Sequence, residues 1–197
     1  MAVKRPAASE EFFGNLAKWR RCSEKEENNF FIVSDTGAKF LVDRTVLSIW
    51  SEVFQKMLAT HMLEKRMGEL KIPDFGDTAL QGLVQFLHGE QLPDDCQEGQ
   101  PLQELCKLAH KYRLQSLQEL CRDQLVSTVT LRALEDVLSL AKVYEEPQLQ
   151  KAAEKCLQDN WKKLKEEENE RLMEITKNFP EAVVEVATEP ILAYKQK

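Results

Sequence analysis

Residues 30–64 read FFIVSDTGAKFLVDRTVLSIWSEVFQKMLATHMLE, and this stretch decides the fold. It begins with two short apolar runs, residues 30–33 and 40–42, and the segment 35–37 (Asp-Thr-Gly) between them tolerates the positive φ of a tight hairpin turn. The apolar spacing then changes to steps of three or four, which predicts one helix or two closely stacked short helices. The residues on this helical face are Val46, Ile49, Val53 and Met57. Two strands that lead into helices indicate a small α+β domain.

The next segments continue the α+β pattern. Residues 69–72 alternate polar and apolar, which predicts a half-buried strand. Asp77 or Thr78 is placed to cap a helix that runs to residues 88–90. Residues 91–100 are rich in turn formers and predict a loop, and Pro101 is placed to open the following helix.

The helical part of the chain contains an internal repeat. Residues 102–125 have the apolar spacing of two helices with a break near Arg113. Their pattern returns thirty-two residues later, so residues 128–161 are expected to form a second helical hairpin. Residues 161–177 predict a charged helix, and one last helix begins near residue 179. The repeated positions are Leu105, Leu108, Ala109, Tyr112, Leu117 and Leu125, which return as Val137, Leu140, Ala141, Tyr144, Leu149 and Leu157.

The composition narrows the range of functions. The chain has 27 Lys and Arg against 33 Asp and Glu, a net charge of −6, which argues against a protein that binds nucleic acid by neutralising many phosphates. No apolar run approaches the roughly 18 residues of a membrane span, and the first residues lack the apolar core of a secretory signal. Five cysteines without an export signal indicate a reducing compartment, and hence cytoplasm or nucleus.

Motifs for catalysis or for cofactor binding are not found in the sequence. The seven glycines are scattered and form no phosphate-binding loop. Cys106 and His110 lie one helical turn apart, but a metal site needs two further ligands, and no second pair has suitable spacing. A core cysteine beside a surface or interface histidine is the simpler interpretation. Paired Cys and His fingers and a basic recognition helix are also absent. The sequence therefore predicts no enzyme, no cofactor and no metal.

The N-terminal residues include an amphipathic segment. Ser9 is placed to cap a helix in which Phe12, Leu16 and Trp19 share one face. This face must be buried, but amphipathicity alone does not choose between the chain's own domain and a second copy. Residues 1–8 are expected to be a disordered tail, and residues 23–29 a polar linker.

The stretch of residues 30–64 resembles the start of a BTB/POZ domain. The positions that match the family pattern are Phe40, Arg44, Val46, Leu47, Ser51 and Phe54, and the triplet Met62, Leu63 and Glu64 matches its hydrophobic-x-Glu motif. Two positions depart from the pattern, because Asn29 stands where the family usually has Asp and Asp43 where it usually has His. Residues 105–121, LCKLAHKYRLQSLQELC, resemble a later family motif in which His110 replaces an Asp.

This resemblance implies an α+β BTB/POZ fold, in which helical hairpins flank a small three-stranded sheet. Residues 131–134 and 149–153 resemble the family's 3-box, so an all-α, partial BACK-like extension is expected to follow. The similarity is to the BTB region of speckle-type POZ (MATH-BTB) or Kelch-like proteins, without their substrate-reading domain. The expected divisions are the tail 1–8, the N-terminal dimerisation helix and linker 9–29, the BTB/POZ domain 30–127, and the helical region 128–197.

The resemblance further implies a dimeric, non-enzymatic adaptor that links an unknown target protein to a cullin-3 RING ubiquitin ligase. The alternative is a BTB scaffold or transcriptional modulator that pairs with itself or with another BTB protein without recruiting a cullin. The residues expected to contact the cullin-3 N-terminal domain are Met57, Leu58, His61, Met62, Glu64 and Tyr112. The residues expected at the dimer interface are Phe12, Leu16, Trp19, Val46, Ile49 and Trp50.

Overall fold

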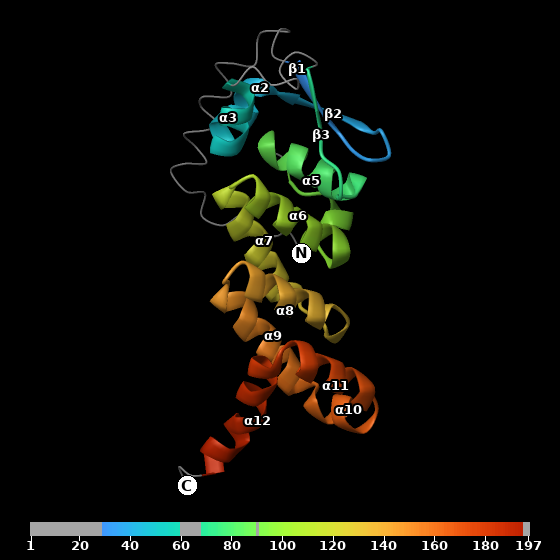
Figure 1. Ribbon diagram of the computed structural model, residues 1–197, viewed down its shortest axis with the longest axis vertical. Coiled ribbons are helices and arrows are strands. Elements are labelled where there is room, and N and C mark those ends of the chain that lie inside the picture. Colours follow the sequence, from blue (N-terminus) through green and yellow to red (C-terminus); the bar gives the residue numbers. More distant parts are fainter. Residues whose placement is uncertain (1–28, 60–67, 90, 195–197) are drawn as a thin grey trace. The chain divides into compact units, whose positions relative to one another are not determined.

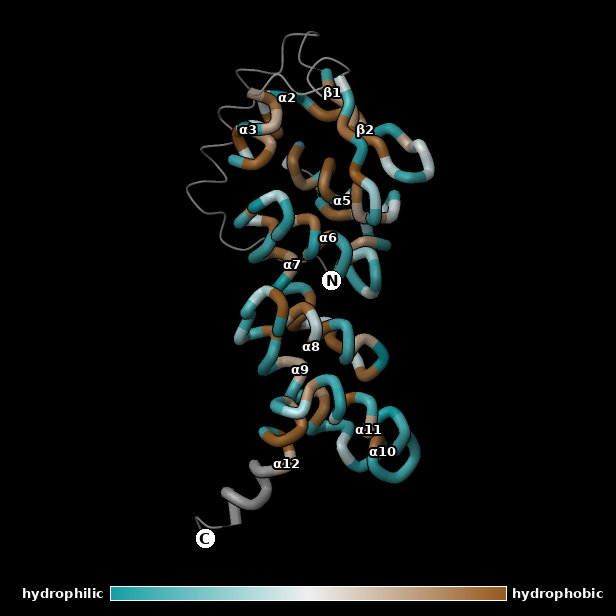
Figure 2. Tube along the Cα trace, viewed as in Figure 1, coloured by the Kyte–Doolittle hydropathy of each residue, from teal (hydrophilic) through white to brown (hydrophobic). Residues whose placement is uncertain are grey.

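The computed structural model describes residues 29–59, 68–89 and 91–194, with side chains up to residue 187 (Figure 1). The chain divides into two compact units, the first ending at Cys121 and the second beginning at Arg122. Each described helix contains both hydrophobic and hydrophilic residues, as expected for amphipathic helices (Figure 2). The expected α+β architecture with a helical extension is confirmed.

The first unit contains a three-stranded sheet with the strand order β2–β1–β3. β1 (Asn29–Val33) pairs antiparallel with β2 (Lys39–Asp43) and in parallel with β3 (Glu69–Lys71). Gly37 has a φ of +86°, which confirms the predicted hairpin turn. On one face of the sheet Phe30 and Ile32 are fully buried, whereas on the other Phe31 and its cross-strand partner Leu41 remain partly exposed. One face of the sheet therefore holds the core.

Two short helices follow β2 rather than one long helix. They are α2 (Arg44–Trp50) and α3 (Glu52–Ala59), and Ser51 between them has an extended backbone. Asp43 caps α2, because its Oδ1 accepts hydrogen bonds from the backbone N–H groups of Thr45 (2.6 Å) and Val46 (3.3 Å). The Asp that replaces the family's usual His therefore satisfies amides that the helix itself leaves unbonded.

The start of α5 (Asp77–Leu87) differs from the prediction. Its N-cap is Gly76, which supplies no side chain, and Asp77 is the first helical residue. The Asp77 carboxylate instead accepts the hydroxyl of Thr36 at the hairpin turn, 2.9 Å from Oδ2. This side chain therefore ties the sheet to α5 instead of capping the helix. In the predicted loop a short 3-10 helix, η2 (Asp94–Cys96), is present, and α6 (Gly99–Lys111) begins two residues before Pro101.

The two predicted helical hairpins are present and end their first helices in the same way. α6 and α7 (Gln115–Thr128) form the first hairpin, and α8 (Leu134–Val143) and α9 (Pro147–Asp159) form the second, after η3 (Leu131–Ala133). Arg113 has a φ of +52° and Glu145 a φ of +54°, so both turns use a left-handed residue. The next N–H bonds back into the helix in each case, to the carbonyl of Ala109 at 2.9 Å or of Ala141 at 3.0 Å.

The predicted charged helix is divided into α10 (Trp161–Glu166) and α11 (Asn169–Asn178). Arg171 of α11 makes tertiary contacts after this break. Its Nε lies 2.8 Å from Glu135 Oε1 and its Nη2 donates to the Leu131 carbonyl at 2.6 Å, which ties α11 to the start of the second hairpin. α12 (Pro180–Tyr194) begins near the predicted position and packs on α9 and α11 through buried Val183 and Val186.

Candidate functional site

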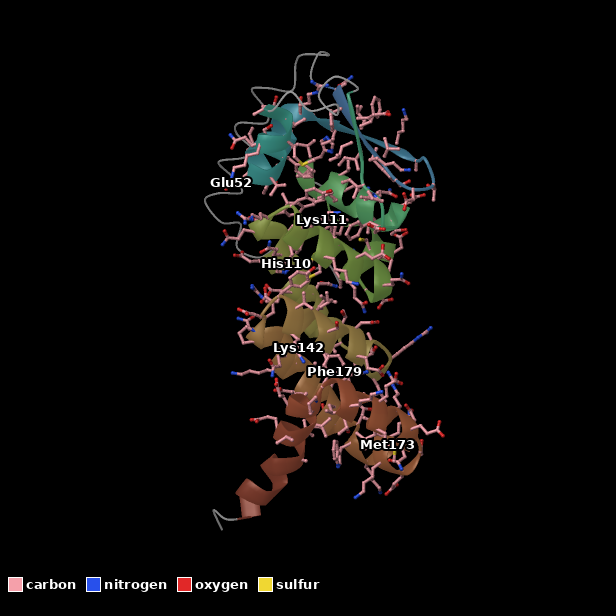
Figure 3. The ribbon with its side chains drawn as sticks, viewed as in Figure 1. Glu52, His110, Lys111, Lys142, Met173 and Phe179 are labelled. Atoms are coloured by element: carbon pink, nitrogen blue, oxygen red, sulfur yellow. The ribbon has the colours of Figure 1, made fainter. Side chains whose placement is uncertain are left out.

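The candidate site is built on α3, a helix of eight residues in the first unit. Phe54 is the one residue of α3 that is fully buried. Met57 and Leu58 are half-buried, and the other exposed positions of the helix include Glu52, which Figure 3 labels at its start. Val53 is half-buried as well, so α3 presents three half-buried apolar side chains among polar ones. Partly exposed apolar side chains ringed by polar ones can form a small contact surface for another protein.

Tyr112 lies behind α3 rather than at the surface, so its expected direct contact with a partner is corrected. Its side chain is 5% exposed, and its ring stacks on Phe54 with centroids 4.4 Å apart and planes inclined by 12°. Burial raises the pKa of the Tyr112 hydroxyl to about 12, so the phenol stays neutral. Tyr112 therefore supports α3 from inside the first unit.

The end of α6 adds an exposed cation beside this aromatic pair. Lys111, labelled with His110 in Figure 3, is exposed. Its Nζ lies 5.2 Å from the centroid of the Phe75 ring and 5.7 Å from that of Tyr112. Both distances fall within the range of cation–π contacts. A positive charge therefore lies at the margin of the aromatic core that carries α3.

Ser51 is a site residue whose role the sequence analysis did not identify, although it matches the family pattern. Its hydroxyl donates to the carbonyl oxygen of Tyr112 at 2.6 Å and accepts the N–H of Phe54 at 3.1 Å. The second bond is an N-cap of α3, and a serine three residues before a buried helical position was its signal in the sequence. The bond to Tyr112 spans 61 residues, so no local pattern predicts it.

The expected dimer residues occupy different environments. Val46 is 0% exposed, because α2 turns this side chain into the core of the first unit, and its assignment to a surface interface is therefore corrected. Ile49 and Trp50 are half-buried, and the Trp50 ring lies 5.1 Å from that of Phe86 in α5. The remaining expected contacts lie outside the described residues; they are Phe12, Leu16 and Trp19 for the dimer, and His61, Met62 and Glu64 for cullin-3.

The described thiols are poorly suited to nucleophilic chemistry. Cys96, Cys106, Cys121 and Cys156 are all free and buried. Burial raises the pKa of Cys96 to about 11 and that of Cys121 well above its usual value, so these thiols stay protonated. Within the ranges that the structure covers, no group of three His, Cys, Asp or Glu residues could hold a metal ion. None of the described helices is both long enough and apolar enough to span a bilayer.

Comparisons with known proteins give a consistent match. The sequence model of the BTB/POZ domain matches residues 21–129, more than half of the 197 residues. Human Kelch repeat and BTB domain-containing protein 4 is 29% identical over 135 residues, which cover 68% of this chain and 25% of that protein. A putative BTB/POZ domain-containing protein of Arabidopsis thaliana is 27% identical over 111 residues, which cover 55% of this chain and 67% of that protein.

Among solved structures, the BTB domain of zebrafish PATZ1 is similar over 62% of this chain and 96% of that chain, with 17% identity and a TM-score of 0.39. The chain spans about a quarter of the length of the Kelch relatives that it matches.

Proposed function

Because this chain belongs to the BTB/POZ family of protein-interaction domains, we propose that it is a dimeric, non-enzymatic adaptor for a cullin-3 RING ubiquitin ligase. In this role it links a target protein to the cullin-3 N-terminal domain, in the cytoplasm or nucleus. The observation that carries the proposal is α3, which presents Met57 and Leu58 half-exposed and leads directly into the residues that contain the hydrophobic-x-Glu motif.

The proposed contact is an apolar anchor accompanied by one charge. Met62 would enter an apolar pocket of the cullin, and Glu64 would pair with a basic residue beside it. Met57, Leu58 and His61 would extend the contact along and after α3. A few well-packed residues commonly supply most of the binding free energy of such an interface, and the polar residues around them exclude water.

The proposed dimer interface combines α2 with the N-terminal segment. Ile49 and Trp50 are half-buried within one chain, so a second BTB chain can remove further apolar surface from water. Phe12, Leu16 and Trp19 would supply the apolar face that packs beside them. The second chain is another copy or a different BTB protein.

Calorimetric titration of the purified chain with the cullin-3 N-terminal domain tests the adaptor function. The Met62→Ala/Glu64→Ala double variant is expected to lose at least about tenfold in affinity, which corresponds to about 1.4 kcal/mol. The matched control is Met173→Ala/Glu174→Ala, which removes an exposed Met and the following Glu from α11 in the second unit (Figure 3). No binding by a folded, dimeric wild-type chain would refute the adaptor and favour the BTB scaffold.

A further inference from the structure

The joint between α2 and α3 contains the buried hydroxyl of Ser51. Ser51 is 1% exposed, its backbone N–H bonds to the Leu47 carbonyl at 3.1 Å, and its carbonyl accepts the N–H of Gln55 at 2.8 Å. The same residue therefore ends α2 and begins α3. Its hydroxyl is not needed for either of these backbone bonds and makes two further ones, to the Phe54 N–H and the Tyr112 carbonyl.

The Tyr112 carbonyl is a group that α6 cannot satisfy by itself. The last carbonyls of a helix have no partner within the helix. Around Arg113 two of them are satisfied by the turn, because the N–H groups of Leu114 and Arg113 bond to the carbonyls of Ala109 (2.9 Å) and His110 (3.2 Å). The Tyr112 carbonyl lies beyond these bonds, and Ser51 satisfies it at 2.6 Å inside the protein. Loss of the Ser51 hydroxyl would therefore leave a buried acceptor without this donor.

α3 is short, so its orientation depends on its contacts with the rest of the first unit. Isolated helices shorter than about 12 residues are marginal in water, and α3 has eight. Only Phe54 is fully buried, and its ring stacks on Tyr112, the same residue whose carbonyl Ser51 binds. The hydroxyl and the aromatic stack thus attach the first turn of α3 to one point at the end of α6. Met57 and Leu58 lie on the following turn, so their direction depends on that point.

We propose that Ser51 is a positioning residue of the partner-binding surface: its hydroxyl fixes α3 on the end of α6 and thereby sets where Met57 and Leu58 face. This inference rests on the proposed function for its binding consequence, but the attachment of α3 is measurable without a partner. Ser51 is a positioning residue and not a contact residue, since it is 1% exposed at the start of the helix that it holds.

The test compares three variants by hydrogen exchange and by calorimetry. Ser51→Ala removes the hydroxyl, and Ser51→Thr retains it. Ser48→Ala is the matched control, because the Ser48 hydroxyl donates to the Arg44 carbonyl at 2.9 Å within α2 and makes no link to α6. Ser51→Ala is expected to raise amide exchange in residues 52–59 about tenfold, while α5 keeps its protection, and to weaken cullin-3 binding about tenfold. Ser48→Ala is expected to change both by less than about twofold. Ser51→Thr keeps the hydroxyl but adds a methyl group at a buried position, so it is expected to lower the stability of the first unit as a whole without a rise in exchange confined to α3.

The outcomes separate this inference from the proposed function. Equal exchange in Ser51→Ala and wild type overturns it, and so does a rise spread evenly over α3 and α5, which indicates general destabilisation. A selective rise in α3 with unchanged affinity also overturns it. If the wild-type chain does not bind cullin-3, the adaptor proposal fails. The exchange comparison then supports or overturns the attachment of α3 by Ser51 without reference to that partner.

Discussion

Gly82 lies at a close contact in the core of the first unit, in the middle of α5. A Cβ placed on it would lie 2.7 Å from Cys96 Sγ and 3.4 Å from Leu105 Cδ2. Cys96 is 0% exposed, and its sulfur has a single side-chain torsion with which to move away. We therefore predict that Gly82→Ala destabilises the first unit, although alanine is the better helix former.

Two opposing effects set the size of this change. Alanine is favoured over glycine in a helix interior by about 1 kcal/mol, whereas an added methyl group in a tight core costs about 1–3 kcal/mol. The expected net loss in the native chain is about 1 kcal/mol. In a Cys96→Ala background the sulfur is absent and the nearest remaining contact is Leu105 at 3.4 Å. The same substitution should then stabilise the first unit by up to about 1 kcal/mol.

The assay must report on the first unit alone, because a chain with two compact units need not unfold in one step. Trp50 is suited to this, since its ring lies 5.1 Å from Phe86 of α5. Urea unfolding would be followed by Trp50 fluorescence after replacement of Trp19 and Trp161 by Phe. If Gly82→Ala has the same effect on the free energy of unfolding with and without Cys96, the close contact does not govern this position.

Two further predictions concern the cap of α2 and the ionisation of Tyr112. Asp43→Ala removes both bonds of the cap and should cost about 1 kcal/mol in the same urea assay, whereas Asp43→Ser should keep most of the stability; equal losses in both variants would contradict the role of the cap. Of the three tyrosines, Tyr112 should ionise last in an ultraviolet titration, with a pKa of about 12 against an ordinary value of 10.0. The unfolded chain releases this proton first, so the stability linked to it is intact below pH 10 and is lost as the pH rises towards 12. Joint titration of all three tyrosines near pH 10 would refute the burial argument.

Elements whose partners are close in sequence could be predicted from the sequence. The hairpin around Gly37 and the helix break at Arg113 both follow from apolar spacing and turn residues over a few positions. The docking of α11 did not follow from such a pattern, because Arg171 bonds to Glu135 and to the Leu131 carbonyl, 36 and 40 residues away. Local charge balance in that stretch carried no information about this tertiary contact.

The residues of the candidate site could likewise be predicted only in part from the sequence. The helical spacing grouped Val46 and Ile49 on one face, but an apolar face can point to the core or to a partner. In the structure α2 buries Val46 completely and leaves Ile49 half-buried. Tyr112 was assigned to the surface by family resemblance, whereas the residues that cover it, Ser51 and Phe54, are distant in sequence and close in space.

The internal repeat places two tyrosines at equivalent helix ends, but the two side chains are buried to different extents. Tyr112 and Tyr144 end their helices with nearly the same backbone angles, a φ of −101° in both and ψ values of 10° and 4°. Tyr112 is nevertheless buried and Tyr144 half-buried. The repeated sequence fixes the helix ends through short-range bonds, which each hairpin makes for itself. The Phe54 ring of α3 contributes to the burial of Tyr112, and no repeated position encodes α3. The attachment of α3 therefore distinguishes the first hairpin from the second, and the proposed partner-binding surface lies on that helix.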